Sequence, residues 1–95
     1  MENPSDWQCF YEKAELLKAL AHPVRLCIVR GLLEKGECNV QHMQSCLNLP
    51  QSTISQHLAK LRLNGILRCR REGLEVFYQV DNELIREMMA VLFRK

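Results

Sequence analysis

The side chains best suited to specific chemistry lie between Gln51 and Leu63. At about 100° per residue, Ile54, Leu58 and Leu61 fall on one face of a helix, and the opposite face is polar. The polar side carries Ser52, Thr53, Ser55, Gln56, Lys60 and Arg62, and Gln51 starts the segment. Glutamine can contact adenine with two hydrogen bonds, serine and threonine suit several bases, and lysine or arginine can meet phosphate. The pattern predicts a helix that reads the major groove of duplex DNA, with a merely solvated polar face as the alternative.

The cations of the chain are segregated along the sequence. The net charge is only +2, but five basic residues and no acidic one lie between Pro50 and Arg71. They are Lys60, Arg62, Arg68, Arg70 and Arg71. A block of one charge sign suits a polyanion such as double-stranded DNA, although a solvated basic surface without a partner would show the same pattern.

Cysteines occur five times, at positions 9, 27, 38, 46 and 69, without a C-x-x-C pair. An odd number without that spacing does not suggest a disulfide framework, so we interpret them as free thiols. Cys9 and Cys38 are expected to be accessible, whereas Cys27 is expected to lie in the core. Cys38 and Cys46 would lie about 12 Å apart along one helix, too far for a bridge within it.

Composition and length exclude several classes of protein. The 95 residues, 47% hydrophobic and 25% charged, predict one folded domain spanning residues 1–95. No apolar run approaches the roughly 18 residues of a membrane span, and the acidic start from Met1 to Trp7 does not resemble a signal peptide, so we expect a cytoplasmic protein. Only two aspartates, Asp6 and Asp81, are present, and no phosphate loop or nucleophile–base set appears. The sequence therefore predicts neither an enzyme nor a cofactor.

Hydrophobic periodicity predicts the elements that position these side chains. Helices are expected at about 7–20, 23–35, 39–47, 51–63 and 82–93, and strands at about 66–71 and 74–80. Pro23 suits a first helical turn, Gly36 ends the second helix, and Glu72-Gly73 turns a hairpin with a basic tip. The predicted fold class is mainly α with a β-hairpin wing, in the order α-α-α-α-β-β-α.

The first and last helices each carry an apolar stripe that nothing else in so short a chain can cover. A small domain also gains stability by burying surface against a copy of itself. We therefore expect a homodimer. The predicted interface residues are Trp7, Phe10, Tyr11, Ala14, Leu84, Ile85, Met88 and Leu92.

Three segments resemble the ArsR/SmtB family of winged helix-turn-helix repressors. They are A-L-A-H-P-V-R-L-C-I-V at 19–29, L-P-Q-S-T-I-S-Q-H-L at 49–58 and R-R-E-G-L-E-V-F-Y-Q-V at 70–80. The resemblance covers nearly the whole chain. It implies a symmetric dimer built from the first and last helices, whose two recognition helices read an imperfect palindrome in a promoter.

Departures from the family concern the metal sites. Metal-sensing members carry a C-V-C-D-type cluster at the start of the third helix, where this chain has Asn39-Val40-Gln41-His42. A second familiar site uses Asp and His residues of the last helix, but this chain has no histidine after His57. The common family metal sites are therefore expected to be absent.

Two alternatives remain open from the sequence. Cys9, Cys38 and His42 are candidates for redox or metal regulation, since the family's first helix can approach the partner's third helix. The other alternative is a winged-helix module that binds a protein through the exposed helix and does not bind DNA.

Overall fold

The computed structural model describes residues 4–94, which form five helices and three strands. In chain order these are α1 (Pro4–Leu20), α2 (Pro23–Lys35), β1 (Cys38–Asn39), α3 (Val40–Leu47), α4 (Gln51–Leu63), β2 (Leu67–Glu72), β3 (Glu75–Val80) and α5 (Glu83–Leu92). Residues 1–3 and 95 lie outside the described residues. The predicted domain, 1–95, and the predicted acidic segment, which begins at Met1, both include some of them. No helix within 4–94 has the length and apolar character needed to span a bilayer.

Helices α2, α3 and α4 follow one another through short capped turns. His22 Nδ1 caps α2 by accepting a hydrogen bond from the backbone N–H of Val24 at 3.1 Å. Pro23 starts the helix and has no N–H that needs a partner. The Asn39 side chain caps α3 by accepting the His42 backbone N–H at 2.8 Å. Helix α3 ends at Leu47 and is capped by Asn48, whose φ of 55° is left-handed and turns the chain toward α4.

The strands form one antiparallel sheet in the order β1-β3-β2. Strands β2 and β3 make the expected hairpin, in which Glu72 pairs with Glu75 and Gly73 supplies the positive φ of 62° at the tip. We call this hairpin, residues 67–80, the wing. Strand β1, which the sequence did not predict, pairs Cys38 with Tyr78 of β3. Two residues are too short for an alternating pattern, and this pairing attaches the α2–α3 connection to the wing.

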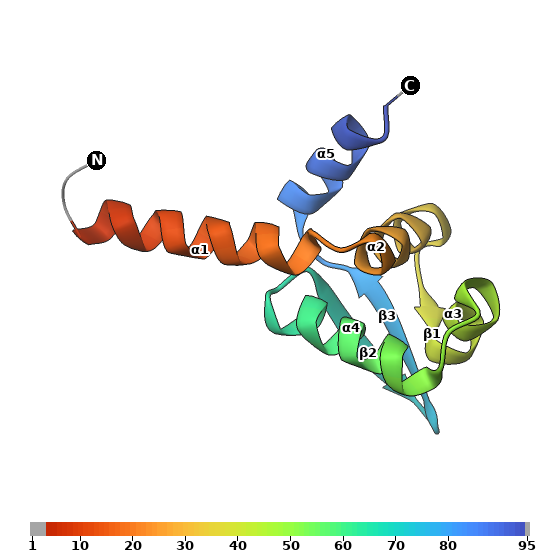
Figure 1. Cartoon of the computed structure of the whole chain (residues 1–95). Helices are drawn as coiled ribbons and strands as arrows, with labels where there is room; N and C mark the ends of the chain where they lie inside the picture. The colour runs from red at the N-terminus through yellow and green to blue at the C-terminus, as the bar shows by residue number, and fades with distance from the viewer. Residues whose placement is uncertain (1–3, 95) are drawn as a thin grey trace.

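The core is built by one face of each of several elements. Its largest fully buried side chains are Val29 of α2, Ile54, Leu58 and Leu61 of α4, Ile66 before β2 and Ile85 of α5. Helix α5 rises from the end of β3 (Figure 1) and adds Ile85 and Met89 to the same core. The mainly α fold with a β wing is confirmed.

The two terminal helices leave apolar surface exposed. Helix α1 projects away from the body of the molecule, and α5 projects from the end of β3 in another direction (Figure 1). Their exposed apolar side chains include Trp7, Phe10, Tyr11, Ala14, Leu17, Leu84, Val91 and Leu92. Ile85, expected in the interface, is 0% exposed and belongs to the chain's own core, while Met88 is half-buried. The reason is that one side of α5 packs into the chain's own core, where Ile85 and Met89 are buried.

Substitutions of a buried and an exposed leucine of α4 should have different effects on the stability of the protein. Leu58→Ala should destabilise the protein by about 2–5 kcal/mol, because it leaves a cavity where a side chain 1% exposed now packs. Leu63→Ala is the matched control, since Leu63 on the same helix is 83% exposed. Urea unfolding measures both variants, and equal destabilisation would contradict this account of the core.

Candidate nucleic-acid interface

Helix α4 presents a continuous polar face to solvent. Its buried residues Ile54, Leu58 and Leu61 face the core, so the helix is fixed in rotation and the opposite side must point outward. Exposed side chains on that side are Gln51, Ser52, Ser55, Gln56, Lys60 and Arg62, and Thr53 is half-buried. Within residues 4–94, the side chains of Ser52, Thr53, Ser55 and Gln56 have no hydrogen-bond partner. These groups are therefore available to an external ligand.

A histidine and an arginine hold the inner side of α4 against two other helices. Arg25 of α2 donates to the carbonyl oxygens of Lys18 and Ala19 at the end of α1. Its Nη1 also lies 3.2 Å from Nδ1 of His57 on α4. Burial lowers the pKa of His57, and neighbouring His22 and Arg25 lower it further. The ring therefore favours the neutral form, which can accept a hydrogen bond from Arg25.

The wing cations differ in what they contact. Arg70 donates to both carboxylate oxygens of Glu37 at 2.8 Å and to Glu72 at 2.9 Å. Its guanidinium also lies 4.7 Å from the ring centre of Phe77. The charge of Arg70 is thus neutralised by two carboxylates. Arg71, next to it, is exposed and has no ion pair within the described part of the chain.

Two further cations lie where α4 meets β2. Arg62 Nη1 lies 3.3 Å from Cys69 Sγ and joins the end of the helix to the strand. With the Gln79 amide turned so that its oxygen faces Arg68, the guanidinium donates to it at 2.6 and 2.7 Å. Lys60 is exposed and has no ion pair within residues 4–94. Lys60 and Arg71 are therefore the predicted site cations with the fewest internal contacts.

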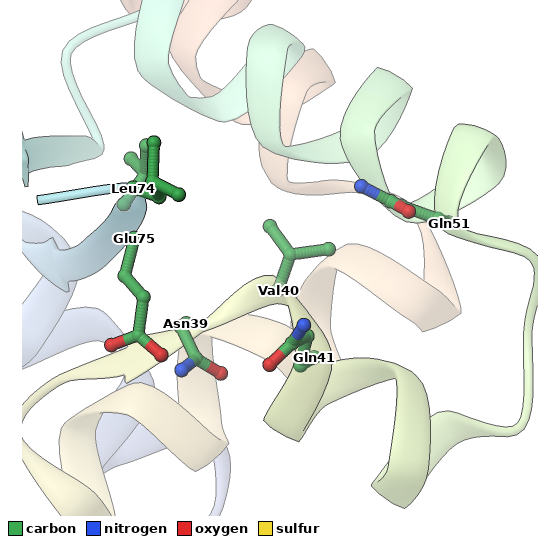
Figure 2. Close-up of a pocket in the computed structure, with 7 residues that line it drawn as sticks. Asn39, Val40, Gln41, Gln51, Leu74 and Glu75 are labelled. Atoms are coloured by element: carbon green, nitrogen blue, oxygen red, sulfur yellow. The ribbon is translucent and has the colours of Figure 1, made fainter.

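The beginning of α4 and the tip of the wing lie at the same end of the molecule (Figure 1). A hollow of about 180 Å³ separates them and is lined in part by Val40, Gln51, Leu74 and Glu75. Figure 2 shows Gln51 extending into this space from the start of α4, with Leu74 on the wing across from it. Leu74 is 99% exposed. The predicted helix and hairpin thus form one surface, although the sequence did not single out Leu74.

The cysteine candidates are not gathered into one site. Cys9 on α1 and His42 on α3 are exposed, but Cys38, expected to be accessible, is only 8% exposed. Cys38 is buried because it lies on β1, paired with β3, and not on α3. Cys27, expected in the core, is exposed on α2. Within residues 4–94, no group of three or more His, Cys, Asp or Glu side chains could hold a metal ion.

Comparison with known proteins assigns this arrangement to a class. A family described as a helix-turn-helix domain matches residues 20–70. The transcriptional repressor PagR of Bacillus anthracis is 38% identical over 92 residues, which cover 97% of this chain and 92% of PagR. The transcriptional activator HlyU of Vibrio cholerae is 42% identical over 79 residues, 83% of this chain and 72% of HlyU.

Solved structures agree with the sequence comparison. The crystal structure of PagR superposes with a TM-score of 0.82 at 41% identity, covering 90% of this chain and 98% of PagR. The crystal structure of NolR from Sinorhizobium fredii superposes with a TM-score of 0.87 at 29% identity, covering 97% of this chain and 91% of NolR. The fold and these likenesses define a winged helix-turn-helix transcriptional regulator and not an enzyme. The chain belongs to the ArsR/SmtB family, which confirms the resemblance seen in its sequence.

The Glu37–Arg70 contact should make wing stability depend on pH. Hydrogen bonding from Arg70 lowers the pKa of Glu37 below its ordinary value of 4.5. A carboxylate with a depressed pKa stabilises the fold above its unfolded-state pKa, and this contribution is lost as pH falls through the folded-state value. Glu37→Gln should therefore lower the urea midpoint at pH 7, and its difference from wild type should shrink below pH 4.5.

The matched control is Glu87→Gln, which removes an exposed carboxylate of α5 that has no ion pair within residues 4–94. It should leave the urea midpoint unchanged at both pH values. A Glu37→Gln difference that stays constant with pH would show that Arg70 does not hold this carboxylate.

Proposed function

We propose that the chain is a transcriptional repressor that binds a palindromic operator as a homodimer. The observation that carries the proposal is the outer face of α4, where hydrogen-bonding side chains stand exposed and unpaired beside a free cation. Base edges in the major groove offer the donors and acceptors that such side chains match. Its family membership supports the same function, and the proposal places the protein in the cytoplasm with the chromosome.

Docking would bring the two halves of the site onto different parts of the duplex. Recognition helices contact base edges through their N-terminal residues, which here include Ser52, Thr53 and Gln56. Lys60 lies farther along α4, toward the phosphate backbone. The wing tip, with the free cation Arg71 and the exposed Leu74, would follow the neighbouring backbone or minor groove.

Dimerisation accounts for the exposed apolar face on the terminal helices. Trp7 is 53% exposed and Tyr11 66%, and the Trp7 ring contacts the rings of both Phe10 and Tyr11 on a helix that projects from the body. On α5, Val91 and Leu92 are 61% and 60% exposed. Apolar surface of this extent is typical of an interface, and two-fold pairing would present two copies of α4 to a palindrome.

Substitutions in α4 and the wing should weaken DNA binding in different ways. Gln56→Ala should cost about 1–3 kcal/mol on the preferred duplex and little on random duplex, because it removes base-specific hydrogen bonds. Arg71→Ala should weaken both duplexes and reduce the salt slope by about one unit for each phosphate that Arg71 neutralises. Fluorescence anisotropy on both duplexes at two salt concentrations measures these effects.

Lys13→Ala is the control, since it removes the same charge from α1 and should leave the salt slope unchanged. If Gln56→Ala weakens both duplexes equally, the proposed docking of α4 is wrong. If the wild type binds no duplex at either salt concentration, the protein-binding module is the better description. The preferred duplex is found by footprinting on the DNA upstream of the protein's own gene.

A charge placed on the apolar face of α5 should prevent dimerisation. Leu92→Glu should give monomers in sedimentation at micromolar concentration, because the interface would have to bury an unpaired carboxylate. Leu74→Glu, on the wing tip, is the matched control and should remain dimeric. A monomeric wild type, or a dimeric Leu92→Glu, would exclude this interface.

A further inference from the structure

Three of the five cysteines line one apolar pocket. The pocket lies between α2 and α3 and has a volume of about 210 Å³. Its lining includes Cys27, Cys38, Cys46, Ile28, Leu32 and Met43. This volume lies below the ~300 Å³ typical of the smallest pockets for drug-sized ligands, so it suits a small ring or a short chain. The site lies away from the polar face of α4.

The thiols in this pocket differ in environment. Cys38 is buried, and burial raises the pKa of its thiol, which keeps it protonated and unreactive. Cys46 is exposed on α3, and its Sγ lies 3.6 Å from Nε2 of His42, one turn earlier on the same helix. A thiol beside an imidazole has the base that a cysteine nucleophile needs. Cys46 is therefore the cysteine equipped to react, at the edge of an apolar cavity.

We propose that this pocket captures small apolar α,β-unsaturated carbonyl compounds by covalent addition to Cys46. This regulatory role rests on the DNA-binding function proposed above. The apolar lining would hold the carbon skeleton of the electrophile. Lys35, also on the lining, would place a positive charge near the carbonyl oxygen.

The addition needs no oxidant and no leaving group. His42 Nε2 accepts the thiol proton, and the sulfur electron pair of Cys46 forms a bond to the β-carbon. The π electrons of the C=C bond move to form an enolate, whose oxygen faces the charge of Lys35. The α-carbon then takes a proton from the His42 imidazolium, which restores the neutral base.

An adduct at Cys46 would act on both parts of the DNA-binding surface. Cys46 lies in the last turn of α3, two residues before the left-handed Asn48 that leads into α4. The lining of the pocket also includes Cys38, whose strand pairs with β3 of the wing. A ligand that separates α2 from α3 would therefore displace α4 relative to the wing.

Matched electrophiles test the site directly. N-phenylmaleimide and 3-maleimidopropionic acid share one reactive group, but the first carries an apolar ring and the second a carboxylate. Peptide mass spectrometry should show that Cys46 prefers the phenyl compound by about tenfold or more over the acid, relative to exposed Cys9 in the same chain. His42→Gln should slow alkylation of Cys46 by at least about tenfold and leave Cys9 unchanged. Equal rates at the two cysteines, or no effect of His42→Gln, would overturn the site.

DNA binding tests the regulatory role separately. Protein alkylated by N-phenylmaleimide should bind its operator at least about tenfold more weakly, a typical allosteric coupling. Cys46→Ser, treated in the same way, should keep its affinity. Full affinity of alkylated wild type would overturn the regulatory role, while absence of DNA binding before alkylation would overturn the proposed function and leave the reactivity result standing.

Discussion

Burial of the inner side of α4 is the constraint on which the rest of the structure depends. Ile54, Leu58 and Leu61 are each no more than 1% exposed, so the helix has one rotation about its axis that keeps them in the core. That rotation turns Ser52 and Gln56 toward solvent. The exposure of the surface proposed to face DNA is thus a consequence of hydrophobic packing, and it needs no attraction among the polar side chains themselves.

Charge in this protein is divided between internal contacts and free cations. Arg70 holds the wing to the loop before β1 through Glu37, and Arg25 of α2 joins the end of α1 to His57 in the middle of α4. Lys60 and Arg71 have no such partners within the described residues. A cation already paired with carboxylates adds less to phosphate attraction than a free one, because its field is largely cancelled. The basic block in the sequence therefore overstates the charge that the surface offers to DNA.

Two apolar surfaces of the molecule have separate proposed roles, one in dimerisation and one in binding a small molecule. The terminal helices expose aromatic and aliphatic side chains on elements that project from the body, which favours burial against a second copy (Figure 1). The pocket between α2 and α3 is concave and small, which favours a small molecule. Both lie next to elements that position α4. Dimerisation and ligand binding would therefore both affect the distance between the two α4 helices of the proposed dimer.

The sequence by itself determined the five helices, the β2–β3 hairpin and the exposed face of α4, but not β1. The bounds Gln51–Leu63 were predicted as observed, because helical periodicity, Pro50 before the helix and Asn64-Gly65 after it are all local signals. Only the tertiary structure decided which charges are paired and which thiols are accessible. Glu37 and Arg70 lie 33 positions apart, and the two-residue β1 that buries Cys38 exists only because β3 pairs with it. Contacts between distant segments leave no periodic trace in the chain, since they depend on how the elements pack against one another.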